Sequence, residues 1–358
     1  MRRPRMLAPE SMDRAFYHCV SRVVNREFVL GPAEKEHFLK LMRCYERLYG
    51  LRIIAYCLMS NHFHILVEVP KRPADEDLPD DVELVARVRS TLGDKQAGDL
   101  EWELRHLRET GSEEWAEALR EKWFSRMWNV SQFMKVLKQR FTQWFNRRHQ
   151  RRGTLWEDRF RSVLVQGECR ALQTMAAYID LNPVRAKICD DPKDYRWCGY
   201  AEAVAGGHVA REALKWLVSL DPHGGPRNES LGVEEALACW RCELFGVPLA
   251  NHRRHVERAR GEEAATLSKK RISRQKALEV LADGGRLSQA EYLRCRVRYF
   301  TDGAAIGSRD YVEQVFRERR EWFSEKRRKG ARSLRGLELR KKPERLYAMR
   351  NLQKDPVG

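Results

Sequence analysis

One hairpin-like stretch constrains the fold of this chain more than any other part of its sequence. Two strongly apolar runs, residues 51–59 and 62–70, flank the short polar break Ser60-Asn61. Apolar runs on both sides of such a break predict a β-hairpin. Side chains alternate between the two faces of a strand, so we expect His62 and His64 on one face and the intervening apolar side chains on the other.

The two histidines indicate a metal site, because two imidazoles held side by side on a rigid strand supply half of one. The alternative is an ordinary strand with one exposed and one packed histidine, since two ligands alone do not make a site. A third histidine, His18, lies in the predicted first strand, where we expect a hydrogen-bonded structural role. The choice between these alternatives depends on residues much further along the chain.

The composition of the chain points to a polyanionic partner. Its 358 residues carry a formal net charge of +17 and give a pI near 9.6, which is typical of proteins that bind nucleic acid. We expect no membrane association, because no run of about 18 apolar residues occurs. Nine cysteines, and no apolar segment behind the basic N-terminus, favour free thiols in the cytoplasm over disulfides in a secreted protein.

The order of the predicted elements indicates the fold class. A strand, a helix, a hairpin, a second helix, a strand and a third helix are predicted at residues 15–24, 32–50, 51–70, 130–149, 160–166 and 168–189. This β-α-β-β-α-β order is typical of the ferredoxin-like antiparallel sheet of an α+β protein. The last helix is then an extra, C-terminal element of the unit, and it contains Tyr178, which is considered below as a candidate catalytic residue.

The chain divides into two regions at residue 205. Residues 1–205 are expected to form the sheet domain, interrupted at 71–125 by an acidic helical insertion, where positions 71–122 hold 15 acidic and 9 basic residues. Residues 206–358 are expected to form a basic, mostly helical region of unknown role. Its helical patterns lie at 232–245, 273–283 and 288–299, and Ser308 is a candidate cap for one more helix.

A tyrosine and an asparagine one helical turn apart complete the candidate site. The phenol of Tyr178 can act as a nucleophile if its target is polarised, and a divalent ion on His62 and His64 would do this. The amide oxygen of Asn182 is a reasonable third ligand. Pro183 predicts that the helix ends or kinks at Asn182, so the amide is alternatively a brace for the helix end. Taken alone, Tyr178 also fits an ordinary half-buried helix tyrosine.

Basic residues are concentrated in one segment. Positions 135–161 hold nine basic and two acidic residues. Cations near a helix C-terminus are mildly stabilising in themselves, but this density favours contacts with phosphate. The residues expected to bind DNA are Arg22, Lys135, Lys138, Arg147, Arg148, Arg151, Arg152, Arg159 and Arg161.

These features resemble those of a known family. Residues 56–67 (YCLMSNHFHILV) resemble the histidine–hydrophobic–histidine (HUH) signature of single-tyrosine transposases. Residues 153–162 (GTLWEDRFRS) and 178–186 (YIDLNPVRA) resemble the two other signatures of REP-associated tyrosine transposases. The three segments follow the order of the family, and the resemblance covers roughly residues 13–200 apart from the acidic insertion.

The resemblance implies a function in DNA transposition. It implies that His62 and His64 hold a divalent metal ion, Mg²⁺ or Mn²⁺, together with Asn182. It also implies that Tyr178 attacks a phosphate of single-stranded DNA with hairpins, leaving a 5′-phosphotyrosine and a free 3′-hydroxyl. We expect the protein to act as a monomer or a homodimer.

Two other functions are compatible with the sequence. One is a ferredoxin-like module that binds single-stranded DNA or RNA on basic and aromatic surfaces without cutting it. Such a module needs neither Tyr178 nor the two histidines, which argues against it. The other is a transposase adopted by its host, which still nicks DNA but no longer moves its own gene.

Overall fold

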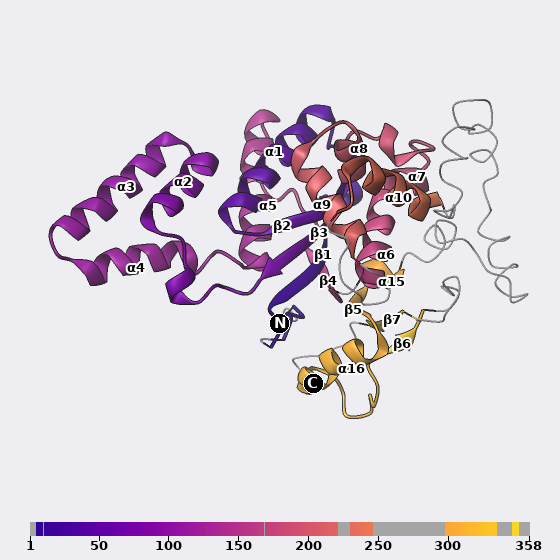
Figure 1. Ribbon diagram of the computed structural model, residues 1–358. Coiled ribbons are helices and arrows are strands. Elements are labelled where there is room, and N and C mark those ends of the chain that lie inside the picture. Colours follow the sequence, from indigo (N-terminus) through magenta and orange to yellow (C-terminus); the bar gives the residue numbers. More distant parts are fainter. Residues whose placement is uncertain are drawn as a thin grey trace, which may run out of the picture.

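A computed structural model shows an α+β protein, as the sequence predicts, but its sheet has seven strands and is mixed, whereas an antiparallel ferredoxin-like sheet was expected (Figure 1). It describes residues 5–9, 11–167, 169–220, 230–245, 298–334 and 346–350. The strands are β1 (Arg14–Arg22), β2 (Arg52–Leu58), β3 (His62–Pro70), β4 (Arg161–Val165), β5 (Gly303–Gly307), β6 (Arg332–Ser333) and β7 (Tyr347–Arg350). They lie in the order β2-β3-β1-β4-β5-β7-β6, with β4 and β5 parallel and the other neighbouring pairs antiparallel.

The predicted hairpin of β2 and β3 is confirmed. The backbone N–H of Met59 donates to the carbonyl of His62 at 2.8 Å and closes the turn at Ser60-Asn61. β1 pairs with β3 along its whole length, so β3 is an interior strand while β2 lies at the edge of the sheet. Interior strands are held on both edges by backbone hydrogen bonds, which makes β3 a rigid support for its side chains.

Helices cover both faces of this sheet. On one face, α1 (Pro32–Leu48) and α5 (Val130–Arg148) enclose an aromatic core, in which the ring centroid of Phe38 lies 4.8 Å from that of Phe63 and 5.1 Å from that of Phe141. On the other face lie α6 (Cys169–Asp180), α8 (Gly199–Val204) and α9 (His208–Ser219). None of the described helices is long and apolar enough to cross a lipid bilayer.

The helix that carries Tyr178 ends where Pro183 predicts. α6 stops at Asp180, and the single turn α7 (Asn182–Arg185) follows after Leu181. A proline at the second position of a helix loses no intrahelical hydrogen bond, so Pro183 is accommodated in α7 although it cannot continue α6. The break redirects the chain directly after the candidate nucleophile.

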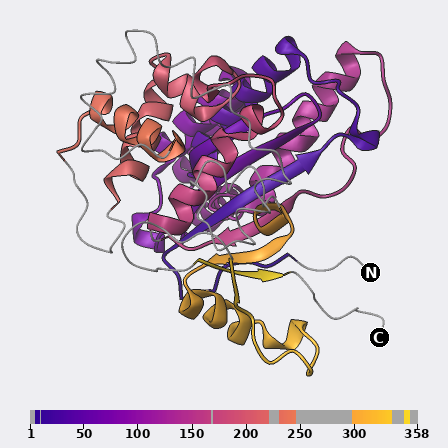
Figure 2. The same cartoon turned by 90° about the vertical axis from the view of Figure 1, so that its right-hand side faces the viewer.

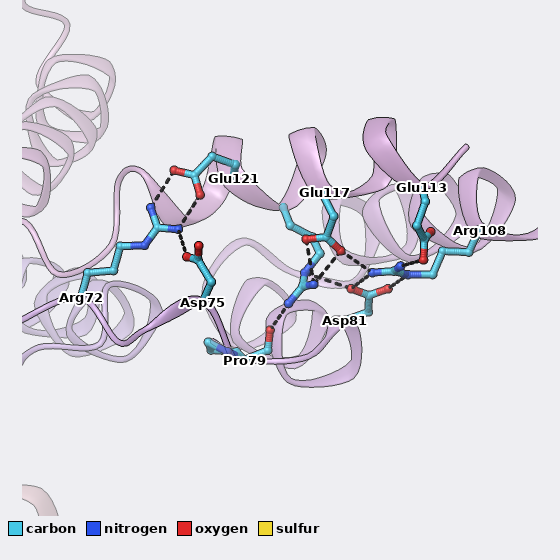
Figure 3. A network of polar contacts seen from close by, with 9 residues as sticks. Arg72, Asp75, Pro79, Asp81, Arg108, Glu113, Glu117 and Glu121 are labelled. Atoms are coloured by element: carbon cyan, nitrogen blue, oxygen red, sulfur yellow. Dashed lines mark hydrogen bonds and ion pairs between the residues drawn. The ribbon is translucent and has the colours of Figure 1, made fainter. Parts of the chain in front are cut away.

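The acidic insertion is helical, as predicted. It comprises α2 (Asp81–Leu92), α3 (Asp94–Glu109) and α4 (Glu113–Phe124), which project to one side of the sheet (left in Figure 1). Ion pairs join its helices and its entry loop: Arg108 contacts Asp81, Glu113 and Glu117, and Arg72 contacts Glu121 (Figure 3). Pairs of this exposure stabilise a protein little one by one, and here they form a connected network.

The C-terminal region, which was expected to be mostly helical, also contributes strands that were not predicted. β5, β7 and β6 continue the sheet beyond β4, a position on which both views agree (Figures 1 and 2). Sequence patterns missed β5 because it reads Gly-Ala-Ala-Ile-Gly, with one β-branched residue and no alternation, and it is buried along its whole length.

Several helices of the same region are confirmed. α10 (Val233–Phe245) and α16 (Arg309–Glu318) lie where predicted, and the hydroxyl of Ser308 accepts the N–H of Tyr311 as a cap. The helix predicted at 273–283 and nearly all of that at 288–299 fall outside the described residues. The remaining short elements are α15 (Arg298–Thr301) and 3-10 turns at Val24–Arg26, Asp75–Asp77, Pro192–Asp194 and Arg320–Trp322.

Candidate active site

β3 places His62 and His64 on the face of the sheet away from α1 and α5, with ring centroids 5.1 Å apart. β1 places a third histidine on the same face. In the β1–β3 register Val20 lies opposite His64 and His18 lies opposite Leu66, so His18 and His64 are diagonal neighbours. Their ring centroids are also 5.1 Å apart.

His62 is held by the turn that precedes it. Its Nδ1 lies 2.6 Å from Oδ1 of Asn61, while Nδ2 of Asn61 donates to the carbonyl of Arg26 at 3.0 Å. Because the Asn61 oxygen can only accept, Nδ1 of His62 carries the proton. The neutral ring therefore keeps its lone pair on Nε2, the atom that a metal ligand needs.

His64 and His18 form a buried hydrogen-bonded pair. Nε2 of His18 lies 2.9 Å from Nδ1 of His64, and Nδ1 of His18 lies 2.8 Å from the carbonyl oxygen of Phe300. His18 has no exposed surface and His64 is 3% exposed. The structural, hydrogen-bonded role expected for His18 is thus confirmed, but its contact with a candidate metal ligand was not predicted.

Burial favours the neutral form of all three histidines. Burial lowers the pKa of His18 and that of His62 to about 4, and neighbouring cations such as Arg185 contribute to both shifts. Burial also lowers the pKa of His64 well below its usual value, with further contributions from His18 and His62. Neutral imidazole is the form that binds metal ions.

Tyr178 lies directly against these histidines. Its ring centroid is 5.8 Å from that of His64 and 5.9 Å from that of His18, both in edge contacts, and it stacks on Phe300 at 4.6 Å. The tyrosine has no exposed surface. Burial raises the pKa of its phenol, and the adjacent Arg185 guanidinium opposes this shift.

Arg185 connects the tyrosine to the asparagine. Its guanidinium carbon lies 4.0 Å from the Tyr178 ring centroid, and its Nη2 donates to Oδ1 of Asn182 at 2.7 Å. Nδ2 of Asn182 is buried and has no hydrogen-bond partner among the described residues. The asparagine therefore braces Arg185 through one lone pair of its oxygen, and the second lone pair stays available.

The predicted DNA-binding residues fall into two groups. The first lies on or just after α5, on the face of the sheet opposite Tyr178 (Lys135, Lys138, Arg147, Arg148, Arg151 and Arg152). Within this group Nζ of Lys138 donates to the carbonyl of Asp158, and burial lowers its pKa to about 8. The second group (Arg22, Arg159 and Arg161) lies close to the end of β1 that pairs with His62.

The loop after α5 brings the two groups towards each other. The N–H of Val24 donates to the carbonyl of Leu155, and the N–H of Glu157 donates to the carbonyl of Arg22. The loop that starts with Arg151 and Arg152 therefore runs beside the end of β1, next to the histidine face.

The residues of the site suit a divalent metal. Within the described part of the chain there is no group of three or more His, Cys, Asp or Glu side chains placed to hold a metal ion. The donors are instead two neutral imidazoles and the amide oxygen of Asn182. A set with so few protein ligands suits an ion that completes its shell with water and phosphate oxygens, as Mg²⁺ and Mn²⁺ do.

Sequence patterns missed three residues of this cluster. Arg185 lies in the turn α7, beyond the break at Leu181, so helical spacing from Tyr178 could not place it at the site. His18 was noticed, but the strand register that brings it to His64 cannot be read from one sequence. Phe300 had no signal at all, because it lies in the short helix α15, directly before the unpredicted strand β5.

Comparisons with known proteins found a family model that matches the N-terminal part of the chain and a similar solved structure. Residues 11–77 match a family model described as "Transposase IS200 like". Among solved structures, the chain is similar to "Structure of the REP associates tyrosine transposase bound to a REP hairpin", with 14% sequence identity and a TM-score of 0.34 over 58% of this chain and 87% of that chain. No curated protein sequence matches the chain. The family match spans β1, α1 and the hairpin with both metal-binding candidates, so residues 11–77 are similar to an IS200-like transposase domain.

Proposed function

We propose that this protein cuts and rejoins single-stranded DNA at hairpin-forming sites through a 5′-phosphotyrosine intermediate, with a divalent metal ion as cofactor. One observation carries the proposal: the Tyr178 ring lies 5.8 Å from His64, so two separate sequence motifs meet in one cluster. The supporting frame is a ferredoxin-like unit of β1, α1, β2, β3, α5 and β4. The hairpin substrate follows from the family resemblance.

In the proposed reaction the Tyr178 oxygen attacks a DNA phosphorus. A bond forms between this oxygen and phosphorus, and the bond from phosphorus to the 3′ oxygen of the preceding nucleotide breaks. The phenolic proton ends on that 3′ oxygen, which leaves a free 3′-hydroxyl. Arg185 donates a hydrogen bond to the phenol and favours its anionic form, which makes the oxygen a better nucleophile.

His62, His64 and Asn182 would hold the metal ion. When bound, a divalent ion polarises a phosphate oxygen and neutralises charge that develops on it. The hydrogen bond from His62 to Asn61 fixes the ring so that Nε2 keeps its lone pair. The carboxamide of Asn182 has the second lone pair that a ligand needs, while its first accepts from Arg185.

The burial of Tyr178 favours a second candidate function, binding without cutting. A phenol with no exposed surface cannot meet a phosphate until the side chains over its ring move. A protein that only binds would retain this closed cluster permanently. The two functions differ in one product, the covalent adduct.

The adduct is therefore the test. The full-length protein is incubated with 5′- or 3′-labelled oligonucleotides that form an imperfect hairpin with single-stranded flanks, in the presence of Mn²⁺ or Mg²⁺. A 3′ label that stays on the protein in denaturing gels, together with a released 5′-labelled fragment ending in a 3′-hydroxyl, supports cutting. A shift in native gels with no denaturation-resistant adduct supports binding alone.

The arginines at the end of α5 give a prediction about DNA affinity. Replacement of the exposed Arg147 and Arg152 by Glu is expected to weaken binding of single-stranded DNA. Each lost phosphate contact should lower the slope of log affinity against log salt by about 0.7. Binding titrations at several salt concentrations measure the slope. Lys95→Glu, in the acidic insertion, is the control, and a double variant with the wild-type slope would remove these arginines from the interface.

Asn182 gives a prediction that separates its two roles. If Asn182 is a ligand, Asn182→Ala should form less adduct and regain part of it when Mn²⁺ is raised about tenfold or more. Asn182→Asp, which keeps an oxygen in place, should need less added metal. If the amide serves only as a brace for Arg185, Asn182→Ala should melt at a lower temperature and show wild-type metal dependence. Melting curves and adduct yields across a Mn²⁺ titration distinguish the two.

A further inference from the structure

We infer that His18 is a positioning residue that holds His64 in the tautomer required of a metal ligand. It does so as the middle member of a hydrogen-bonded chain from the Phe300 carbonyl to His64 Nδ1, which we call the histidine relay. The inference deepens the proposed function and rests on it, because it concerns the same metal site. No sequence motif of the transposase resemblance assigns this role to His18.

The first step concerns the end of the relay at Phe300. A backbone carbonyl oxygen accepts hydrogen bonds and cannot donate them. It lies 2.8 Å from Nδ1 of His18, so this nitrogen carries a proton. The proton position in His18 is therefore set by the main chain of a residue 282 positions away.

The second step is that the proton position in His18 determines the proton position in His64. A neutral imidazole has one N–H, so the other nitrogen of His18, Nε2, has the lone pair. That nitrogen lies 2.9 Å from Nδ1 of His64, so Nδ1 of His64 is the donor. His64 then keeps its own lone pair on Nε2. A charged His18 would reverse this bond, but a charge on a side chain with no exposed surface is costly.

The relay also fixes the plane of the His64 ring. The two rings lie nearly coplanar, with an interplanar angle of 14°, and both touch the edge of Tyr178. A hydrogen bond in the ring plane resists rotation of the imidazole about its Cβ–Cγ bond. The His64 ring is therefore oriented before any metal binds, which lowers the entropic cost of binding.

A separate device produces the same tautomer at His62. The Arg26 carbonyl orients the Asn61 amide, and the Asn61 oxygen then accepts the proton of His62 Nδ1. The two candidate ligands thus reach the same state, with Nε2 free of a proton, through unrelated partners. Buried imidazoles need hydrogen-bond partners, but this need alone does not explain why Nδ1 is the protonated nitrogen in both His62 and His64.

The test measures Mn²⁺ binding without DNA. His18→Leu removes the acceptor for His64 Nδ1, and we expect Mn²⁺ affinity, read from the EPR signal of free Mn²⁺, to fall about 10- to 100-fold. His18→Gln can accept from His64 and donate to the Phe300 carbonyl, so it should regain most of the affinity. His37→Leu, a half-buried histidine on the opposite face of the sheet, is the control and should bind as the wild type does.

A second readout does not depend on metal. Long-range ¹H–¹⁵N spectra of the histidine rings in the wild-type protein should show the proton of His64 on Nδ1. A proton on Nε2 of His64, or a folded His18→Leu variant with wild-type Mn²⁺ affinity, would overturn the inference. A wild-type protein that binds no Mn²⁺ would contradict the proposed function instead, and the spectra would then still decide the tautomer. The spectra of the wild-type protein also establish the tautomer of His64 if the His18→Leu variant does not fold.

Discussion

Replacement of Tyr178 by Phe is expected to abolish covalent attachment to DNA, by at least about 10³-fold, while binding of the same oligonucleotide stays close to that of the wild type. The substitution removes the nucleophilic oxygen and keeps the ring, so the stacking on Phe300 and the edge contacts with both histidines are retained. Loss of the hydrogen bond from Arg185 should lower the free energy of unfolding by about 1 kcal/mol. Denaturing gels measure the adduct and native gels measure the binding.

A matched control is available on the other face of the sheet. Tyr17 is also buried, and its hydroxyl accepts the N–H of Ala8 at 2.8 Å. Tyr17→Phe should form the adduct at the wild-type rate, although it loses a comparable hydrogen bond. Undiminished adduct from Tyr178→Phe would remove Tyr178 from the mechanism and direct attention to another nucleophile.

Replacement of His62 by Ala is expected to have the second-largest effect. Removal of an outer partner of a metal ligand commonly costs about 10- to 100-fold, and removal of a ligand itself should exceed this. Adduct formation should therefore fall by more than about 100-fold, and EDTA should have the same effect on the wild-type protein. His62 is only half-buried and lies next to the hairpin turn, so the shorter side chain leaves the core of the sheet intact.

The metal dependence has its own control. His208→Ala changes an exposed histidine at the start of α9 and should leave adduct formation unchanged. Full adduct formation in EDTA would contradict a metal-dependent reaction, whatever the behaviour of His62→Ala. Loss of activity in His62→Ala together with full activity in EDTA would point to a different role for this imidazole.

The central part of the fold was predictable because its signals are local. The alternation along β3 separates Phe63 from His64, and Pro183 marks the end of α6. Both follow from the geometry of a few neighbouring residues. The strand β5 was not predictable, since Gly303–Gly307 contains mostly glycine and alanine and owes its strand conformation to pairing with β4 and β7.

The candidate site shows the same limit. Tyr178, His62 and His64 could be named because their spacing and types are distinctive within short segments. His18 could be placed on a strand, but its contact with His64 depends on the register between β1 and β3, which one sequence does not reveal. Phe300 contributes a backbone carbonyl and a stacked ring, and neither contribution has a sequence pattern.

The hydrogen bond between Phe300 and His18 cannot form early in translation, because its two partners are synthesised at different times. A ribosome adds about 5 to 20 residues per second, so roughly 15 to 60 s pass between the synthesis of the two partners. During this time the β2–β3 hairpin and both of its histidines exist, but His18 has no Phe300 carbonyl to set its proton. If the relay supports metal binding and the proposed function holds, a chain released before Phe300 is made would bind the metal ion more weakly and cut DNA less than a chain that includes Phe300.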